Sequence, residues 1–132
     1  DPKPLGAVAL IGCLLWVVGF IVEATADAQK STFNSDPANR GRFVNVGLWR
    51  WSRHPNYFGE ILLWIGITVI AAPEFQGWQW LALISPLFVI FLLTKVSGVP
   101  LLEKRGDEKW GDDPEYQRYK RDVPVLLPRP PR

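Results

Sequence analysis

The chain has 132 residues, of which 48% are apolar, and a formal net charge of +2. A charge this small gives no reason to expect a nucleic-acid partner. The single cysteine, Cys13, excludes an intrachain disulfide. With only one cysteine and one histidine, the chain lacks the ligand patterns of known zinc sites, so we expect no metal site.

Three apolar blocks predict membrane helices over residues 5–23, 57–72 and 78–95. The uncharged run of the first block is about 27 Å long as an α-helix, which is close to the thickness of a hydrocarbon core. Blocks two and three are separated by a short turn at 73–77 and predict a transmembrane hairpin. The expected fold class is therefore all-α, a polytopic transmembrane helical bundle with about three membrane helices.

Glycines recur along the first block at Gly6, Gly12 and Gly19. Small residues allow helices to approach closely in lipid, so we expect this helix to pack against another one. Glu23 marks its expected end.

Two polar segments flank the hairpin. Residues 24–56 form the first, in which 24–33 can continue as a short amphipathic helix before turn-forming residues at 34–41. Pro55 is suited to the first position of the second membrane helix, because its missing N–H would be unpaired there. The second segment, 99–128, predicts an amphipathic tail with a helix capped by Asp113.

The positive charges predict the orientation. Fourteen of the fifteen Lys and Arg residues lie in the 24–56 connection or after residue 94. By the positive-inside rule both segments face the cytoplasm, in an integral membrane protein that we expect in a bacterial inner membrane. The chain starts with Asp-Pro rather than Met, and we interpret 1–132 as one membrane domain, the C-terminal half of a longer protein.

The segment 49–60 contains the most candidate ligand-binding residues. Arg53 and His54 precede a helix whose free N–H groups and dipole also favour anions, which predicts a phosphate site. Trp49 and Trp51 can stack on a planar ring. The alternative is an interfacial belt, with the aromatic rings at the headgroups and Arg bound to lipid phosphate.

Glu60 lies one turn inside a membrane helix, where an unpaired carboxylate costs about 2.5–3.5 kcal/mol. It shares a helix face with Tyr57 and Trp64. A ligand contact and a structural salt bridge, for instance to Arg53 or Lys95, are both open.

Further charges are candidates for holding a polar ligand. They are Asp27, Lys30, Arg40 and Arg42 in the first connection, and Glu103, Lys104 and Arg105 after the last membrane helix. Solvated charge near a membrane is the alternative for each.

Four motifs resemble the C-terminal region of the steroid 5-alpha-reductase family, in particular its bacterial branch. They are Asp27-Ala-Gln-Lys30-x-x-Phe33, Gly47-Leu-Trp-Arg-Trp-Ser-Arg-His-Pro-Asn-Tyr-Phe-Gly-Glu60, Ser97-Gly-Val-Pro-Leu-Leu-Glu103 and Asp113-Pro-Glu-Tyr116-x-x-Tyr119. The Arg-His-Pro-x-Tyr core and the late Glu with Tyr-x-x-Tyr are also similar to sterol C14 and delta-7 reductases and to isoprenylcysteine carboxyl methyltransferases.

The resemblance implies a cytoplasmic pocket that binds NADPH in the reductases and S-adenosylmethionine in the methyltransferases. The implied cofactor-binding residues are Asp27, Lys30, Arg42, Trp49, Arg53, His54, Asn56, Tyr57, Glu60, Glu103 and Tyr116. In the family the catalytic Glu and Tyr lie in the N-terminal half, so the resemblance assigns no catalytic residue here.

We therefore expect an NADPH-dependent reductase of a C=C bond conjugated to a carbonyl in a lipophilic, steroid-like or polyprenoid substrate. Its expected partners are that substrate, membrane lipid and the N-terminal half of the same protein. The alternatives are a membrane S-adenosylmethionine-dependent methyltransferase of a lipid or prenylated thiol, and a non-catalytic lipid-binding subunit.

Overall fold

The structure is a computed structural model that describes residues 6–71, 77, 81 and 83–131. Within these ranges it is all-helical and contains no strand. Most of the expected turn at 73–77 lies outside the described residues. The order is α1 (Ala7–Ser35), η1 (Pro37–Asn39), η2 (Gly47–Arg50), α2 (Pro55–Ala71), α3 (Ile84–Phe91), a π-helical turn η5 (Leu92–Val96), α4 (Gly98–Trp110) and α5 (Pro114–Asp122).

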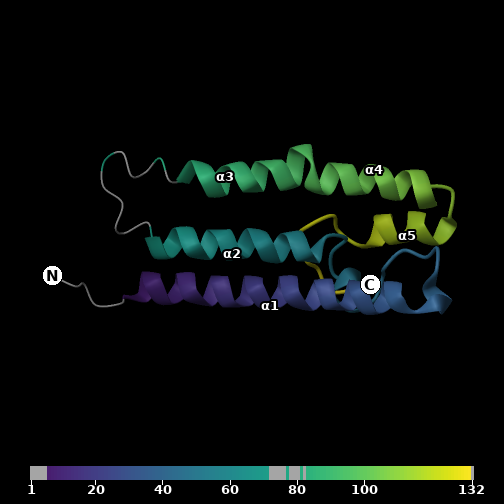
Figure 1. Ribbon diagram of the computed structural model, residues 1–132, viewed down its shortest axis with the longest axis horizontal. Coiled ribbons are helices and arrows are strands. Elements are labelled where there is room, and N and C mark those ends of the chain that lie inside the picture. The colour runs from purple at the N-terminus through teal and green to yellow at the C-terminus, as the bar shows by residue number, and fades with distance from the viewer. Residues whose placement is uncertain (1–5, 72–76, 78–80, 82, 132) are drawn as a thin grey trace.

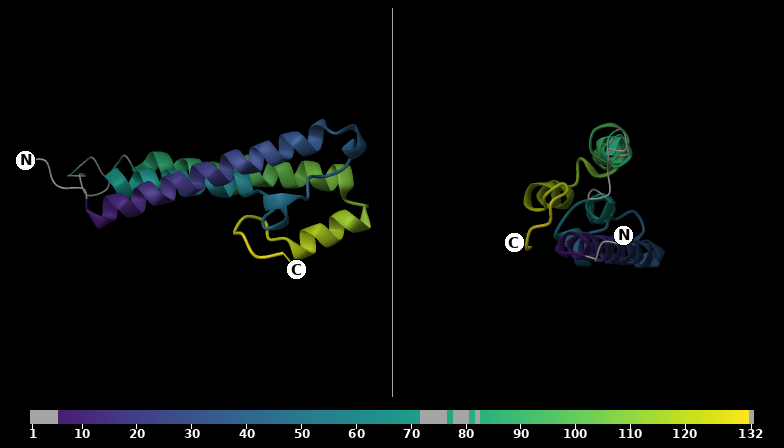
Figure 2. Two further views of the ribbon diagram at one scale, coloured as in Figure 1. Left: turned by 90° about the horizontal axis from the view of Figure 1, so that it is seen from below. Right: turned by 90° about the vertical axis from the view of Figure 1, so that its left-hand side faces the viewer.

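The long helices lie side by side along one axis (Figure 1). α1 and α2 run antiparallel, and α3 with α4 forms an almost continuous rod on the other side of α2. α5 and the C-terminus lie at one end of this bundle, opposite to the N-terminal end of α1 (Figures 1 and 2).

Two helical stretches, Ala7–Ser35 and Ile84–Trp110, are long and apolar enough to cross a membrane, and α2 is a shorter apolar helix. Only 11% and 17% of their apolar windows are buried, whereas the core helix of a soluble protein would be mostly buried. Exposed apolar surface on this scale belongs against lipid or other membrane helices. The expected class, a helical membrane bundle, is confirmed.

Glycines set the distance between α1 and α2. A Cβ at Gly66 would lie 2.6 Å from Gly12 O and from Trp16 N, and one at Gly59 would lie 2.6 Å from Gly19 O. The two backbones therefore touch, as the recurring glycines of the first block predicted. Gly6 is the exception, because nothing lies within 4 Å of its Cβ position.

The first helix begins at Ala7 and continues without a break past Glu23, its expected end, to Ser35, so the amphipathic helix that was possible at 24–33 is part of it. Residues 24–35 contain no Gly or Pro, so nothing in the sequence stops the helix where it leaves the apolar block. The chain leaves α1 at Asp36, which caps η1 by accepting a hydrogen bond from Ala38 N at 2.9 Å.

Two predicted helix starts are confirmed. α2 begins at Pro55, and α5 begins at Pro114 after Asp113, whose side chain accepts a hydrogen bond from Glu115 N at 2.9 Å. Both starts follow from local chemistry, a proline at the first helical position and an acidic cap.

Candidate functional site

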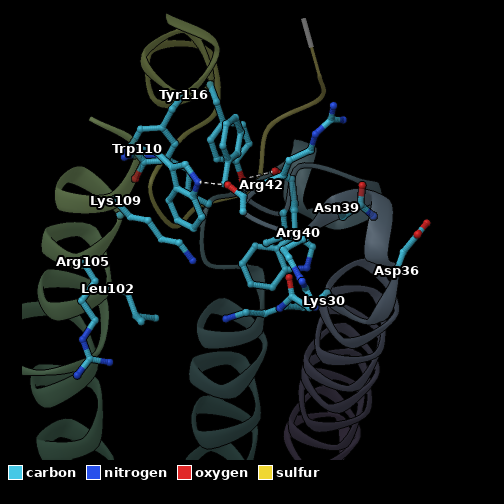
Figure 3. Close-up of a pocket in the computed structure, with 18 of the residues that line it drawn as sticks. Lys30, Asp36, Asn39, Arg40, Arg42, Leu102, Arg105, Lys109, Trp110 and Tyr116 are labelled. Carbon is cyan, nitrogen blue, oxygen red and sulfur yellow. Dashed lines mark hydrogen bonds between the residues drawn. The ribbon is translucent and has the colours of Figure 1, made fainter. Parts of the chain in front are cut away.

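A cavity of about 610 Å³ lies at the polar end of the bundle, between the end of α1, the loop after it, α4 and α5 (Figure 3). This is within the range of small-molecule sites, roughly 300–1,000 Å³. In Figure 3 the side chains of Lys30 and Lys109 point toward each other across the space, from α1 and α4.

The cavity is rich in positive charge. Six cationic side chains and two carboxylates line it: Lys30, Arg40, Arg42, Arg53, Arg105 and Lys109, with Asp36 and Glu103. Within the described part of the chain, only Arg53 of these six cations has an ion-pair partner. The other five are available to an anionic ligand.

Aromatic rings form one end of the cavity. Phe43 packs against Trp110, Tyr116 and Tyr119 at centroid distances of 5.9, 5.1 and 5.1 Å. Trp110 Nε1 donates a hydrogen bond to Gly41 O at 2.8 Å, which ties α4 to the loop after α1. Lys109 Nζ lies 4.7 Å from the centre of the Trp110 ring, within cation–π distance.

Burial changes the ionisation of the two tyrosines in this cluster. It raises the pKa of Tyr116 to about 12, and the nearby Glu103 carboxylate adds to the rise. Burial also raises the pKa of Tyr119, whose hydroxyl donates a hydrogen bond to Trp49 O at 2.6 Å. Both phenols are therefore neutral donors at physiological pH.

Glu103 is the centre of an ion-pair cluster at the start of α2. Arg53 Nη1 donates to Glu103 Oε1, and His54 Nε2 lies 3.2 Å from Glu103 Oε2. Burial raises the pKa of Glu103, but the hydrogen bond from His54 and the charge of Arg53 outweigh it and hold the pKa below its ordinary value of 4.5. The anion that Arg53 and His54 bind in this structure is thus a side chain of the protein itself.

The loop before α2 is tied down on several sides. Arg53 Nε donates to Val123 O at 3.1 Å, and the fully buried Ser52 donates to Leu126 O at 2.8 Å and accepts from His54 N at 3.1 Å. Trp49, which is 4% exposed, donates from Nε1 to Ala26 O at 3.0 Å. These bonds hold the cavity wall to α1 and to the C-terminal residues.

Seven of the eleven expected site residues line the cavity: Lys30, Arg42, Trp49, Arg53, His54, Glu103 and Tyr116. Asp27, Asn56, Tyr57 and Glu60 do not. Asp27, Tyr57 and Glu60 lie instead near Glu23 where α1 faces the first turns of α2, close enough for their charges to interact. Asn56 Oδ1 is buried without a hydrogen-bond partner within the described residues.

The structure differs from two expectations, one about the ion-pair partner of Glu60 and one about the position of Trp51. Of the partners considered for Glu60, Arg53 binds Glu103 instead. Trp51 does not line the cavity and is 40% exposed.

Several lining residues were missed by the sequence analysis as site residues, among them Phe43, Lys109, Trp110 and Tyr119. Of these, only Tyr119 could have been identified from the sequence, because it belongs to the Tyr-x-x-Tyr motif. Phe43 and Trp110 are single aromatic residues in polar segments, and only the folded chain brings them together.

The chain matches a family model described as "Protein of unknown function (DUF1295)" over residues 1–123. The mouse delta(14)-sterol reductase TM7SF2 is 37% identical over 76 residues, covering 47% of this chain and 18% of that protein. The steroid 5-alpha-reductase DET2 of Gossypium hirsutum is 28% identical over 119 residues, covering 90% and 41%. The probable O-methyltransferase ustE of Ustilaginoidea virens is 26% identical over 66 residues, covering 50% and 23%.

The chain therefore spans less than half the length of these curated relatives. No solved structure matches it significantly.

Proposed function

The chain belongs to the DUF1295 family and is related to sterol and steroid 5-alpha-reductases, and from this premise we propose that it is the cofactor-binding part of a membrane reductase. The cofactor is NADPH, and the substrate is a lipophilic, steroid-like or polyprenoid molecule with a C=C bond conjugated to a carbonyl. The site faces the cytoplasm, on the side where the Lys and Arg residues collect.

The observation that carries this proposal is the charge of the cavity. NADPH carries three phosphate groups, and five lining cations have no ion-pair partner within the described ranges. Cations of this kind bind phosphate through charge-assisted hydrogen bonds. The residues present therefore fit the cofactor.

The chain's own residues would bind and orient the cofactor. Lys30, Arg42 and Lys109 neutralise phosphate charge, and the rings of Trp110 and Tyr116 contact the planar base. When bound, NADPH supplies the hydride, while the acid for the carbonyl oxygen belongs to the part of the relatives that this chain does not cover.

The alternative is a methyltransferase using S-adenosylmethionine, for which the relative ustE is the support. This methyl donor has a net positive charge, so a cavity lined by six cations and two carboxylates disfavours it. A non-catalytic lipid-binding subunit is the third reading.

A binding experiment separates these functions. The full-length protein, purified in detergent, is titrated with NADPH and with S-adenosylmethionine while its thermal stability is followed. We expect NADPH to raise the melting temperature through binding to the folded state. Stabilisation by the methyl donor alone would end the reductase proposal, and no response to either would favour the lipid-binding subunit.

A pair of lysines on α4 localises the site. Lys109→Gln, in the cavity, should weaken NADPH binding by about 1.5–3 kcal/mol, the typical contribution of a hydrogen bond to a charged group. Lys104→Gln is the matched control, because Lys104 is exposed on the same helix and does not line the cavity. Equal affinities of the two variants would remove Lys109 from the site.

A further inference from the structure

The residues after α5 form a strap, defined here as residues 124–129, that is bound to the loop before α2. Arg53 N donates to Pro124 O at 2.9 Å, Arg129 N donates to Trp51 O at 3.0 Å, and the Ser52 hydroxyl donates to Leu126 O. The strap is therefore held at the same depth along the bundle as Trp51 and Arg53.

This depth is that of a membrane interface. α2 begins at Pro55, two residues after Arg53, and its apolar run follows within its first turn. In Figures 1 and 2 the strap, in yellow, turns back from α5 toward the start of α2. If α2 is embedded, the strap lies in the layer of the lipid headgroups.

The strap exposes apolar side chains at this depth. Leu127 is 70% exposed and Val125 is 39% exposed, and the neighbouring Trp51 is 40% exposed. Arg50, which precedes Trp51, is exposed as well. At a membrane interface, aromatic and aliphatic side chains can contact the lipid acyl chains while a neighbouring arginine binds the lipid phosphates.

The backbone of the strap is hydrogen-bonded in part to the loop before α2. An irregular segment near lipid must have its N–H and C=O groups satisfied. Pro124 and Pro128 have no N–H, and the backbone groups named above at 124, 126 and 129 are hydrogen-bonded to the loop before α2. Of the four N–H groups in the strap, that of Arg129 is bonded, and those of residues 125–127 have no partner within the described residues, so the strap suits the hydrated headgroup layer rather than the hydrocarbon core.

From these observations we propose that the strap is a membrane anchor, in which Leu127 and Val125, together with Trp51, insert into the headgroup layer of the bilayer. The occupant of this surface is lipid, because the strap is bonded to residues 51–53, directly before the apolar helix α2 begins at Pro55. The anchor fixes the wall that carries Arg53 and His54 relative to the membrane. This inference does not depend on which cofactor the cavity binds.

Fluorescence of a labelled cysteine tests the anchor. Cys13→Ser, together with replacement of any cysteine outside residues 1–132, removes the native thiols, and Leu127→Cys provides a site for an environment-sensitive fluorophore in the full-length protein. The control is Asp112→Cys, an exposed position in the turn between α4 and α5 at the end farthest from α1's N-terminus. Both proteins are reconstituted into vesicles of phosphatidylcholine and phosphatidylglycerol.

We expect the label at 127 to be quenched by a lipid that carries a nitroxide near its headgroup, and to be protected from iodide in the buffer. The label at 112 should show the opposite pattern. If the label at 127 behaves like the one at 112, the strap faces water and the proposal fails. Protection at 127 from both quenchers would show that protein rather than lipid covers the strap, and would also overturn it.

Discussion

Glu103 is the residue on which the wall of the cavity depends. Its carboxylate binds Arg53 and His54, whose side chains are 14% and 7% exposed, while its own side chain is 20% exposed. At this degree of burial a cation without a partner is costly. The cluster therefore stabilises the fold whether or not a ligand is bound.

We expect Glu103→Gln to lower the free energy of unfolding by about 1.5–3 kcal/mol, because the amide replaces a charge-assisted bond to Arg53 with a weaker one. The measurement is unfolding by SDS titration in detergent micelles. Glu108→Gln is the control, since Glu108 is exposed on the same helix and has no ion pair within the described residues. Equal losses in both variants would mean that the cluster contributes nothing.

The same carboxylate predicts a pH dependence. The pKa of Glu103 is below its ordinary value of 4.5 in the folded state, so its contribution to stability is present above that pH. This contribution is lost as the pH falls below about 4.5 and the carboxylate is protonated. The difference in unfolding free energy between the wild type and Glu103→Gln should therefore shrink on acidification, and a constant difference would contradict this account.

The sequence predicted Arg53, His54 and Glu103 as parts of one site, but it did not predict that Glu103 pairs with the other two. Their motifs are separated by about fifty positions, and each charge alone is compatible with a ligand, a lipid or a side-chain partner. Only the approach of α4 to the start of α2 decides among these.

At the scale of elements, α1 and α2 form the most extensive contact between helices within the described residues. Gly66→Ala places a methyl group 2.6 Å from Gly12 O and Trp16 N, which are backbone atoms and cannot move independently. We expect the helices to separate, with a loss of about 1–3 kcal/mol in the same unfolding assay. Gly6→Ala, at the N-terminal cap of α1 where nothing lies within 4 Å, lacks this clash and should cost far less, and an equal loss there would show that close packing of the helices is not the cause.

Helix starts could be predicted from the sequence better than helix ends. Pro55 and Asp113-Pro114 contain their own start signals, and the structure confirms both. Glu23 marks where the apolar block ends, but a helix can leave a membrane without stopping, and α1 continues to Ser35. Hydropathy thus indicates which part of a helix lies in the membrane, but not where the helix ends.

At the scale of the whole molecule, the cavity is formed by segments far apart in the sequence. The charge distribution predicted that residues 24–56 and the tail lie on one side, and the cavity is lined by both. It did not predict the aromatic contacts of Phe43 with Trp110, which join the loop after α1 to the end of α4. Single aromatic residues have no period or spacing that would reveal such a contact.

The net positive charge of the cavity predicts how ligand binding responds to salt. Salt screens the attraction between lining cations and the phosphates of NADPH, so the affinity for NADPH should fall as sodium chloride is raised. For S-adenosylmethionine, which is positively charged, the same screening weakens a repulsion, so its affinity should stay constant or rise. Isothermal titration of the full-length protein at low and high salt measures both, and Lys109→Gln should reduce the salt dependence for NADPH. An affinity for NADPH that does not change with salt would show that these cations do not contact its phosphates.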